Sequence, residues 1–160
     1  MSAKIEGKAV AEILIDVFDS GHKVLICGNG GSSAEADHFV GELLGHYKLN
    51  RKPLPAISLS HFATVSAIGN DECFDNVFSR QVEALGNRGD CLVCLSTSGK
   101  SPNIIKAVAT AIKKKMVLCV FIPRQDNEIG DRFGACQERH LKVIHQACEI
   151  IDKHYAKNSR

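Results

Sequence analysis

Short apolar runs alternate with stretches of helical periodicity along the chain, and this alternation constrains its fold more than any other feature. Each run is mostly apolar on both of its faces, as a strand is when helices cover both sides of a parallel sheet. The strand-like runs are residues 23–27, 54–60, 91–95 and 116–122, and the helical stretches are residues 7–20, 34–45, 61–68, 74–86, 102–114 and 137–155. The order predicts an α/β fold, a three-layer sandwich with a central parallel sheet flanked by helices.

The size and composition of the chain narrow the classes of protein it can belong to. Its 160 residues contain no linker-like segment, so we expect a single domain over residues 1–160. No apolar run approaches the roughly 20 residues needed to cross a bilayer, and the first residues lack the apolar core of a secretory signal. A net charge of +2 is too small to indicate a nucleic-acid partner. We therefore expect a cytoplasmic protein with neither nucleic acid nor membrane as partner.

Seven cysteines, an odd number at irregular spacing, lie mostly inside apolar segments. This distribution favours buried thiols in a reducing compartment over a disulfide framework. Cys91 and Cys94 have the CxxC spacing, but they fall within a strand-like run and not at a helix start, where redox pairs lie. We interpret them as core residues.

Two loops rich in glycine and serine, residues 28–33 and 96–101, each follow a predicted strand and precede a predicted helix. Both should lie at the carboxyl edge of the sheet, where open α/β folds bind ligands. In the first loop, Ser32 and Glu35 have the spacing of a capping box, which predicts a helix start near Ser33. In the second, Ser101 before Pro102 predicts an N-cap followed by proline at the first helical position.

These loops have the chemistry of an anion site. Helix N-termini offer free backbone amides and a positive dipole end, and the second loop adds hydroxyl groups from Ser96, Thr97, Ser98 and Ser101. The pattern predicts a bound phosphate monoester. Serine and glycine also make ordinary turns and caps, and either loop taken alone allows that interpretation.

Nucleotide ligands fit the first loop less well than a small sugar phosphate. No Gly-Lys-Ser/Thr sequence follows it, so it is not a P-loop. Gly28 and Gly30 begin a dinucleotide fingerprint, but Ser33 stands where the third glycine belongs, and the next strand ends without the acidic residue that binds an adenosine ribose.

His38 and Glu42 are four residues apart, so they project from one face of the helix after the first loop. An imidazole and a carboxylate can hold zinc or a similar divalent ion, although a surface hydrogen bond would have the same spacing. The last predicted helix offers further ligands, and the spacing alone does not choose among them: Gln137, Glu138, His140 and His145.

Four stretches together resemble the sedoheptulose 7-phosphate isomerases, also called phosphoheptose isomerases, of the SIS (sugar isomerase) domain superfamily. They are "CGNGGSSAEADHFVGELLGHY", "AIGNDECFDNVFSRQVEALG", "DCLVCLSTSGKSPNIIKAV" and "QERHLKVIHQ", in order over nearly the whole chain. The resemblance implies a flavodoxin-like SIS domain and an aldose–ketose isomerase. The implied reaction converts D-sedoheptulose 7-phosphate to D-glycero-D-manno-heptose 7-phosphate through an enediol, the first step toward the heptose precursor of bacterial surface polysaccharide.

The resemblance also implies a site. One zinc ion per subunit would be bound by His38, Glu42, Gln137 and His145. For the chemistry we hypothesise that Glu42 is the base that takes the carbon-bound proton and that His145 moves protons between the oxygens. The implied substrate-binding residues are Asn29, Gly30, Gly31, Ser32, Glu42, Asn70, Asp71, Ser96, Thr97, Ser98, Ser101 and Gln137. The family further implies a homotetramer with sites between subunits. The last helix is apolar around most of its girth, which fits a subunit interface or the interior of a monomer.

The chain departs from the family at three places. Its amino-terminal helix is short. The strand-like run 116–122 joins Val120 to Phe121 where relatives carry a loop and a helix, and we expect missing residues there instead of a true deletion. Ala135 stands two residues before Gln137, where relatives usually have an arginine, so any contact from that position is in doubt.

Three other functions are compatible with an SIS fold. A non-catalytic regulator that binds the bacterial replication initiator would lack the carboxylate of Glu42. A sugar-phosphate sensor fused to a transcription regulator would carry a helix-turn-helix, and the sequence shows none. A sibling isomerase acting on another ketose phosphate remains open, because function resides in the site and not in the fold.

Overall fold

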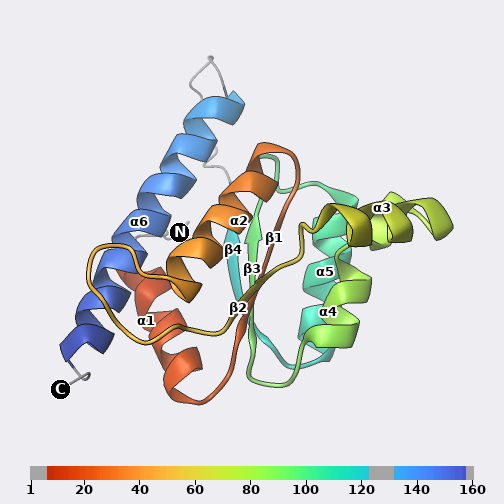
Figure 1. The fold of residues 1–160 in the computed structure, drawn as a ribbon. Coiled ribbons are helices and arrows are strands. Elements are labelled where there is room, and N and C mark those ends of the chain that lie inside the picture. The colour runs from red at the N-terminus through yellow and green to blue at the C-terminus, as the bar shows by residue number, and fades with distance from the viewer. Residues whose placement is uncertain (1–6, 123–131, 158–160) are drawn as a thin grey trace, which may run out of the picture.

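The computed structural model describes residues 7–122 and 132–157 (Figure 1). Its elements are α1 (Gly7–Asp19), β1 (Val24–Gly28), α2 (Gly31–Leu44), β2 (Ala56–Ser58), α3 (Phe62–Asp71), a 3-10 turn η1 (Phe74–Asn76), α4 (Ser79–Leu85), β3 (Cys91–Leu95), α5 (Pro102–Lys113), β4 (Val117–Phe121) and α6 (Arg132–Lys157). Every predicted strand and helix is present. The predicted helix over residues 74–86 is divided into η1 and α4. None of the helices in the described ranges has the length and apolar content to cross a membrane.

The four strands form one parallel sheet in the order β2-β1-β3-β4. This is the order of flavodoxin-like sheets, whose ligands bind where β1 and β3 lie side by side and their connections leave in opposite directions. β1 and β3 pair from Val24 with Cys91 to Gly28 with Leu95, and all ten of their residues are buried. The two Gly/Ser loops therefore leave neighbouring strands at the same edge, as predicted.

Helices cover both faces of the sheet, which confirms the three-layer sandwich (Figure 1). Val24 and Ile26 of β1 point into a core shared with α1, α2 and α6. Leu25 and Cys27 point into the opposite core, shared with α4 and α5. This alternation follows from the two-residue period of a strand. It places α6 beside α2 and against α1.

Val120 and Phe121, between which residues were expected to be missing, are neighbours in β4. Val120 pairs with Cys94 and Phe121 with Leu95, in the same register as the rest of β4. That residues are missing at this point stays a prediction.

Helix α3 has no buried residue, and Phe62 at its start is 83% exposed. In Figure 1 it projects from the right of the sheet, on the side away from α6.

Candidate active site and metal centre

The first loop turns sharply from β1 into α2. Gly30 has φ +56, a left-handed conformation that glycine adopts without strain. A Cβ on Gly28 would lie 2.4 Å from the carbonyl oxygen of Ser32, so only glycine allows this approach. Ser32 is consequently buried, and its backbone N–H donates to the carbonyl of Asn29 at 3.0 Å.

The predicted capping box is wrong. α2 begins at Gly31, so Ser32 lies inside the helix, and no side chain caps its start. Glu35 does not fold back toward the loop but is buried between α2 and α6, where its carboxylate lies 3.5 Å from Nδ1 of His140. The glycine turn has closed the helix start with backbone hydrogen bonds alone, which leaves Glu35 free to face α6.

The two candidate histidines of α6 have different partners. His140 is buried against Glu35, with its Nε2 3.4 Å from the thiol of Cys136. His145 instead faces α2, where its Nε2 lies 2.9 Å from Nε2 of His38.

His38, Glu42 and His145 form a cluster of metal-ligating groups. Glu42 Oε1 lies 3.5 Å from His38 Nε2, and one donor atom from each of the three residues falls within 4.8 Å of the others. The three side chains are exposed or half-buried, so an ion could reach them. Two imidazole nitrogens and a carboxylate oxygen are a donor set that suits zinc. These residues therefore fit the metal that the sequence implied.

Gln137 packs against the start of α2. A Cβ on Gly31 would lie 2.1 Å from Gln137 Nε2, so the amide occupies the space that a side chain at position 31 would take. Gln137 and His145 are eight residues apart on α6, and they contact α2 at Gly31 and His38, seven residues apart. The two helices thus run in the same direction, with Gln137 nearer the glycine turn.

The second loop presents only part of its hydroxyl set. Ser96 is buried, and its hydroxyl accepts the backbone N–H of Gly99 at 2.9 Å. Ser98 is exposed, with its hydroxyl 3.4 Å from that of Ser101. Ser101 occupies the predicted N-cap position of α5, but its side chain makes no capping hydrogen bond. Thr97, Ser98 and Ser101 are therefore the more accessible hydroxyl groups.

A reciprocal amide pair joins the two loops. Asn29 Nδ2 donates to Asn103 Oδ1 at 2.9 Å, and Asn103 Nδ2 donates back to Asn29 Oδ1 at 2.8 Å. Asn103 is 2% exposed and was not singled out from the sequence. Its position directly after Pro102, at the start of the helix that follows the second loop, was the available signal.

Asn70 and Asp71 lie apart from these groups. Both are exposed at the end of α3, and Asn70 Nδ2 donates to Asp71 Oδ1 at 2.9 Å. The structure therefore does not bring them to the His38, Glu42 and His145 cluster within one chain (Figure 1).

A hollow of about 470 Å³ lies beside His145. Tyr47, Glu138, Lys142 and Glu149 help to line it, and no residue of the two Gly/Ser loops does. Glu149 is paired with Lys153 and Lys48, whose hydrogen bonds lower its pKa to about 2. The hollow thus adjoins the metal-ligating cluster on the outer side of α6.

Six of the seven cysteines are buried, and Cys73 is exposed. Cys91 and Cys94 are fully buried in β3, and burial raises the pKa of the Cys91 thiol. Cys94 Sγ lies 3.6 Å from Cys27 Sγ of the neighbouring strand. Cys91 and Cys94 are therefore free thiols inside the sheet, in agreement with the interpretation of the CxxC pair as core residues.

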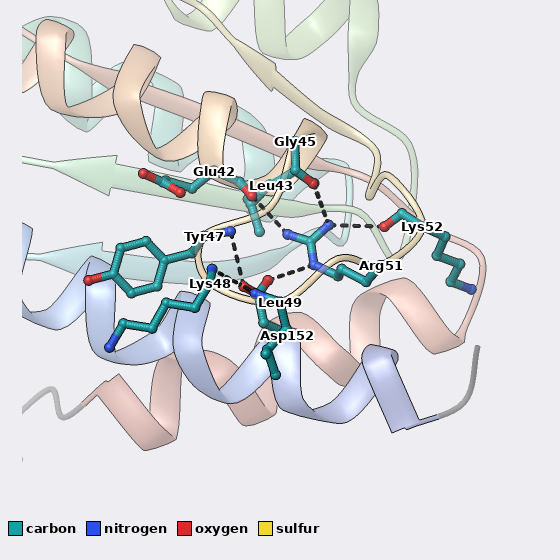
Figure 2. A network of polar contacts seen from close by, with 9 residues as sticks. All are labelled: Glu42, Leu43, Gly45, Tyr47, Lys48, Leu49, Arg51, Lys52 and Asp152. Carbon is teal, nitrogen blue, oxygen red and sulfur yellow. Dashed lines mark hydrogen bonds and ion pairs between the residues drawn. The ribbon is translucent and has the colours of Figure 1, made fainter. Parts of the chain in front are cut away.

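A buried polar network next to the cluster was missed from the sequence (Figure 2). Asp152 of α6 pairs with Arg51 of the loop after α2, with Arg51 Nε 2.8 Å from Asp152 Oδ1 and both side chains 0% exposed. Asp152 follows Ile144, Cys148 and Ile151 on the buried stripe of α6. A lone acidic residue on an apolar stripe was the signal that could have identified it.

Comparison with known proteins gives a consistent result. Residues 3–121 match the SIS domain family. Phosphoheptose isomerase 1 of Campylobacter jejuni is 45% identical over 159 residues, which cover 91% of this chain and 85% of that protein. Phosphoheptose isomerase of Escherichia fergusonii is 43% identical over 159 residues, with 92% and 83% covered.

Solved structures agree. A phosphoheptose isomerase from Francisella tularensis superimposes with a TM-score of 0.84 at 35% identity, and one from Neisseria gonorrhoeae with 0.81 at 36%. In both cases the match covers 92% of this chain and 85% of the other.

Proposed function

The chain belongs to the phosphoheptose isomerase family of SIS-domain proteins, and on that premise we propose that it converts D-sedoheptulose 7-phosphate to D-glycero-D-manno-heptose 7-phosphate. The observation that carries the proposal is the meeting of His38, Glu42 and His145 on the helix that begins in the first glycine loop and on α6. A regulator without chemistry would have no use for Glu42 at this point. The product would enter the synthesis of a heptose precursor of bacterial surface polysaccharide.

Zinc would be held by His38, Glu42 and His145, with the amide of Gln137 as fourth ligand. When bound, zinc supplies a Lewis acid that polarises the sugar carbonyl and stabilises enediolate charge. The support for His38, Glu42 and His145 is their donor set. Gln137 is taken from the family resemblance, and its amide lies against Gly31, on the helix that carries His38 and Glu42.

The reaction moves one carbon-bound proton and one hydroxyl proton. Glu42 takes a proton from C1 of the ketose to give the enediol, and the proton is returned to C2 to give the aldose. His145 carries the hydroxyl proton from O1 to O2, so that C1 becomes the carbonyl carbon. The two loops bind the phosphate through Thr97, Ser98 and Ser101 and through the backbone of residues 29–31, which orients C1 and C2.

The working unit is a homotetramer whose sites lie between subunits, with each chain contributing residues 1–160 as a single domain. The support is α3, which has no buried residue although it carries Asn70 and Asp71. In an assembly, these two side chains can complete the site of a neighbouring subunit. A cytoplasmic location remains a prediction from the sequence.

The test is an isotope-exchange experiment on a Glu42→Gln variant. The wild-type protein should isomerise sedoheptulose 7-phosphate and exchange the transferred carbon-bound hydrogen with deuterated solvent. Because the neutral amide of the introduced glutamine cannot act as a base, the variant should bind the sugar phosphate but lose exchange by at least about 10²-fold. NMR of the recovered sugar measures isomerisation and hydrogen exchange.

Glu83→Gln is the matched control, since Glu83 is an exposed glutamate on α4, far along the chain from the cluster. It should exchange at the wild-type rate. Retained exchange in Glu42→Gln would show that Glu42 is not the base. If the wild-type protein isomerised five- or six-carbon ketose phosphates but not the seven-carbon one, it would be a sibling isomerase.

A further inference from the structure

We propose that Tyr47 is a positioning residue for His145, and that the buried Arg51–Asp152 pair holds Tyr47 in place. The inference rests on the proposed function, because it assigns Tyr47 a role through His145. It concerns residues outside the metal-ligating cluster.

Tyr47 covers one side of the His145 ring. The two rings are stacked, with centroids 5.0 Å apart and planes 6° apart. His38 meets the same imidazole edge-on, with centroids 5.1 Å apart and planes 79° apart. An imidazole held between a parallel ring and a perpendicular ring loses most of its freedom to rotate. The stack therefore fixes the direction in which His145 presents Nε2 to His38.

The backbone around Tyr47 is fixed by one carboxylate. Asp152 Oδ2 accepts the N–H groups of Tyr47, Lys48 and Leu49 at 3.0, 2.6 and 3.0 Å (Figure 2). Its other oxygen, Oδ1, accepts Nε of Arg51. A loop with three successive N–H groups on a single buried anion has little freedom to move, so the Tyr47 ring is carried to a defined place.

Arg51 extends the same network to the helix that carries Glu42. Its Nη2 donates to the carbonyl of Glu42 at 2.8 Å, and its Nη1 donates to that of Leu43 at 2.9 Å. Figure 2 shows the guanidinium lying between these carbonyls and Asp152. One buried ion pair thus joins the end of α2, the Tyr47 loop and α6, seven residues after His145.

The experiment compares Tyr47→Leu with Tyr47→Phe. Leucine keeps apolar bulk but cannot stack, so we expect kcat to fall about 10- to 100-fold, KM to change less than about threefold and zinc affinity to fall about tenfold. Phenylalanine keeps the ring, and the Tyr47 hydroxyl makes no hydrogen bond within the part of the chain that the structure describes. We therefore expect values of kcat, KM and zinc affinity within about twofold of wild type. Zinc affinity is measured by competition with a chromophoric chelator.

Asn50→Ala is the control in the same loop. Asn50 is exposed, and the backbone N–H groups that Asp152 accepts belong to other residues, so kcat and zinc affinity should stay at wild-type values. Tyr47→Met replaces Tyr47→Leu if the latter fails to fold. Equal kcat and zinc affinity in the leucine and phenylalanine variants would overturn the positioning role. The chelator competition needs no substrate, so it tests the positioning role of Tyr47 independently of turnover. Failure of the wild-type protein to turn over the heptose phosphate would overturn the proposed function alone.

Discussion

Gly31 and Gln137 occupy adjoining space, so a side chain at position 31 would displace the Gln137 amide. The atom nearest to an added Cβ at Gly31 is the amide nitrogen of Gln137, the mobile end of a long side chain. An alanine at position 31 would therefore move the amide and leave the backbone in place. Gly31→Ala therefore tests whether Gln137 is a metal ligand without a mutation of Gln137 itself.

We expect Gly31→Ala to lower zinc affinity about 10- to 100-fold through displacement of the Gln137 amide. The free energy of unfolding should change by less than about 1 kcal/mol, because a flexible side chain absorbs the added carbon. Chelator competition and urea unfolding measure the two effects. Gly41→Ala is the matched control, since Gly41 lies in the same helix with nothing within 4 Å of an added Cβ; it should bind zinc normally. Unchanged zinc affinity in Gly31→Ala would argue against Gln137 as a ligand.

The strength with which Asp152 anchors the loop after α2 to α6 depends on its charge. Burial alone would raise the pKa of Asp152, but the N–H groups of Leu49 and Lys48 and the Arg51 guanidinium outweigh it, so its pKa lies below the usual value. A carboxylate whose pKa is lowered by folding stabilises the folded state above the unfolded-state pKa of about 3.9. That stabilisation is lost as the pH falls through the lower folded-state value.

Asp152→Asn should therefore lower the free energy of unfolding at pH 7 by about 3–5 kcal/mol, since it leaves Arg51 buried without a counter-charge. The deficit relative to wild type should be constant from pH 7 to about pH 4 and should shrink as the pH falls further, toward the lowered pKa at which the folded wild-type carboxylate is itself protonated. Urea unfolding followed by circular dichroism across this range measures it. Asp16→Asn, at an exposed position on α1, should change stability by less than about 0.5 kcal/mol. A deficit that does not shrink in acid would show that shape, not charge, explains the role of Asp152.

The elements themselves could be predicted because their signals are local. β3 was predicted with its observed bounds, Cys91–Leu95, because a strand buried on both faces leaves a continuous apolar run. The start of α2 was predicted near Ser33 and lies at Gly31. The prediction failed because the spacing of Ser32 and Glu35 is equally compatible with a carboxylate that faces α6. Arg51 and Asp152 are 101 residues apart, and pairing at that range leaves no local pattern.

Helix α3 carries two proposed substrate-binding residues but lies apart from the metal-ligating cluster of its own chain. The His38, Glu42 and His145 cluster lies between α2 and α6, whereas α3 projects on the other side of the sheet with Asn70 and Asp71 exposed (Figure 1). If Asp71 serves the site of a neighbouring subunit, two inactive variants can complement each other. Asp71→Ala and Glu42→Gln should each be inactive alone, because each removes one part of every site.

Co-expression of these two variants with different affinity tags should yield mixed oligomers that recover isomerase activity. With random assembly, about a quarter of the sites would combine an intact α3 from one subunit with an intact Glu42 from another, so activity should approach about a quarter of the wild-type value. Co-expression of Glu42→Gln with His145→Ala is the control, because Glu42 and His145 come from the same chain and no mixed site can contain both. Activity in the first mixture but not in the control requires a site shared between subunits, and inactivity in both would overturn the shared site.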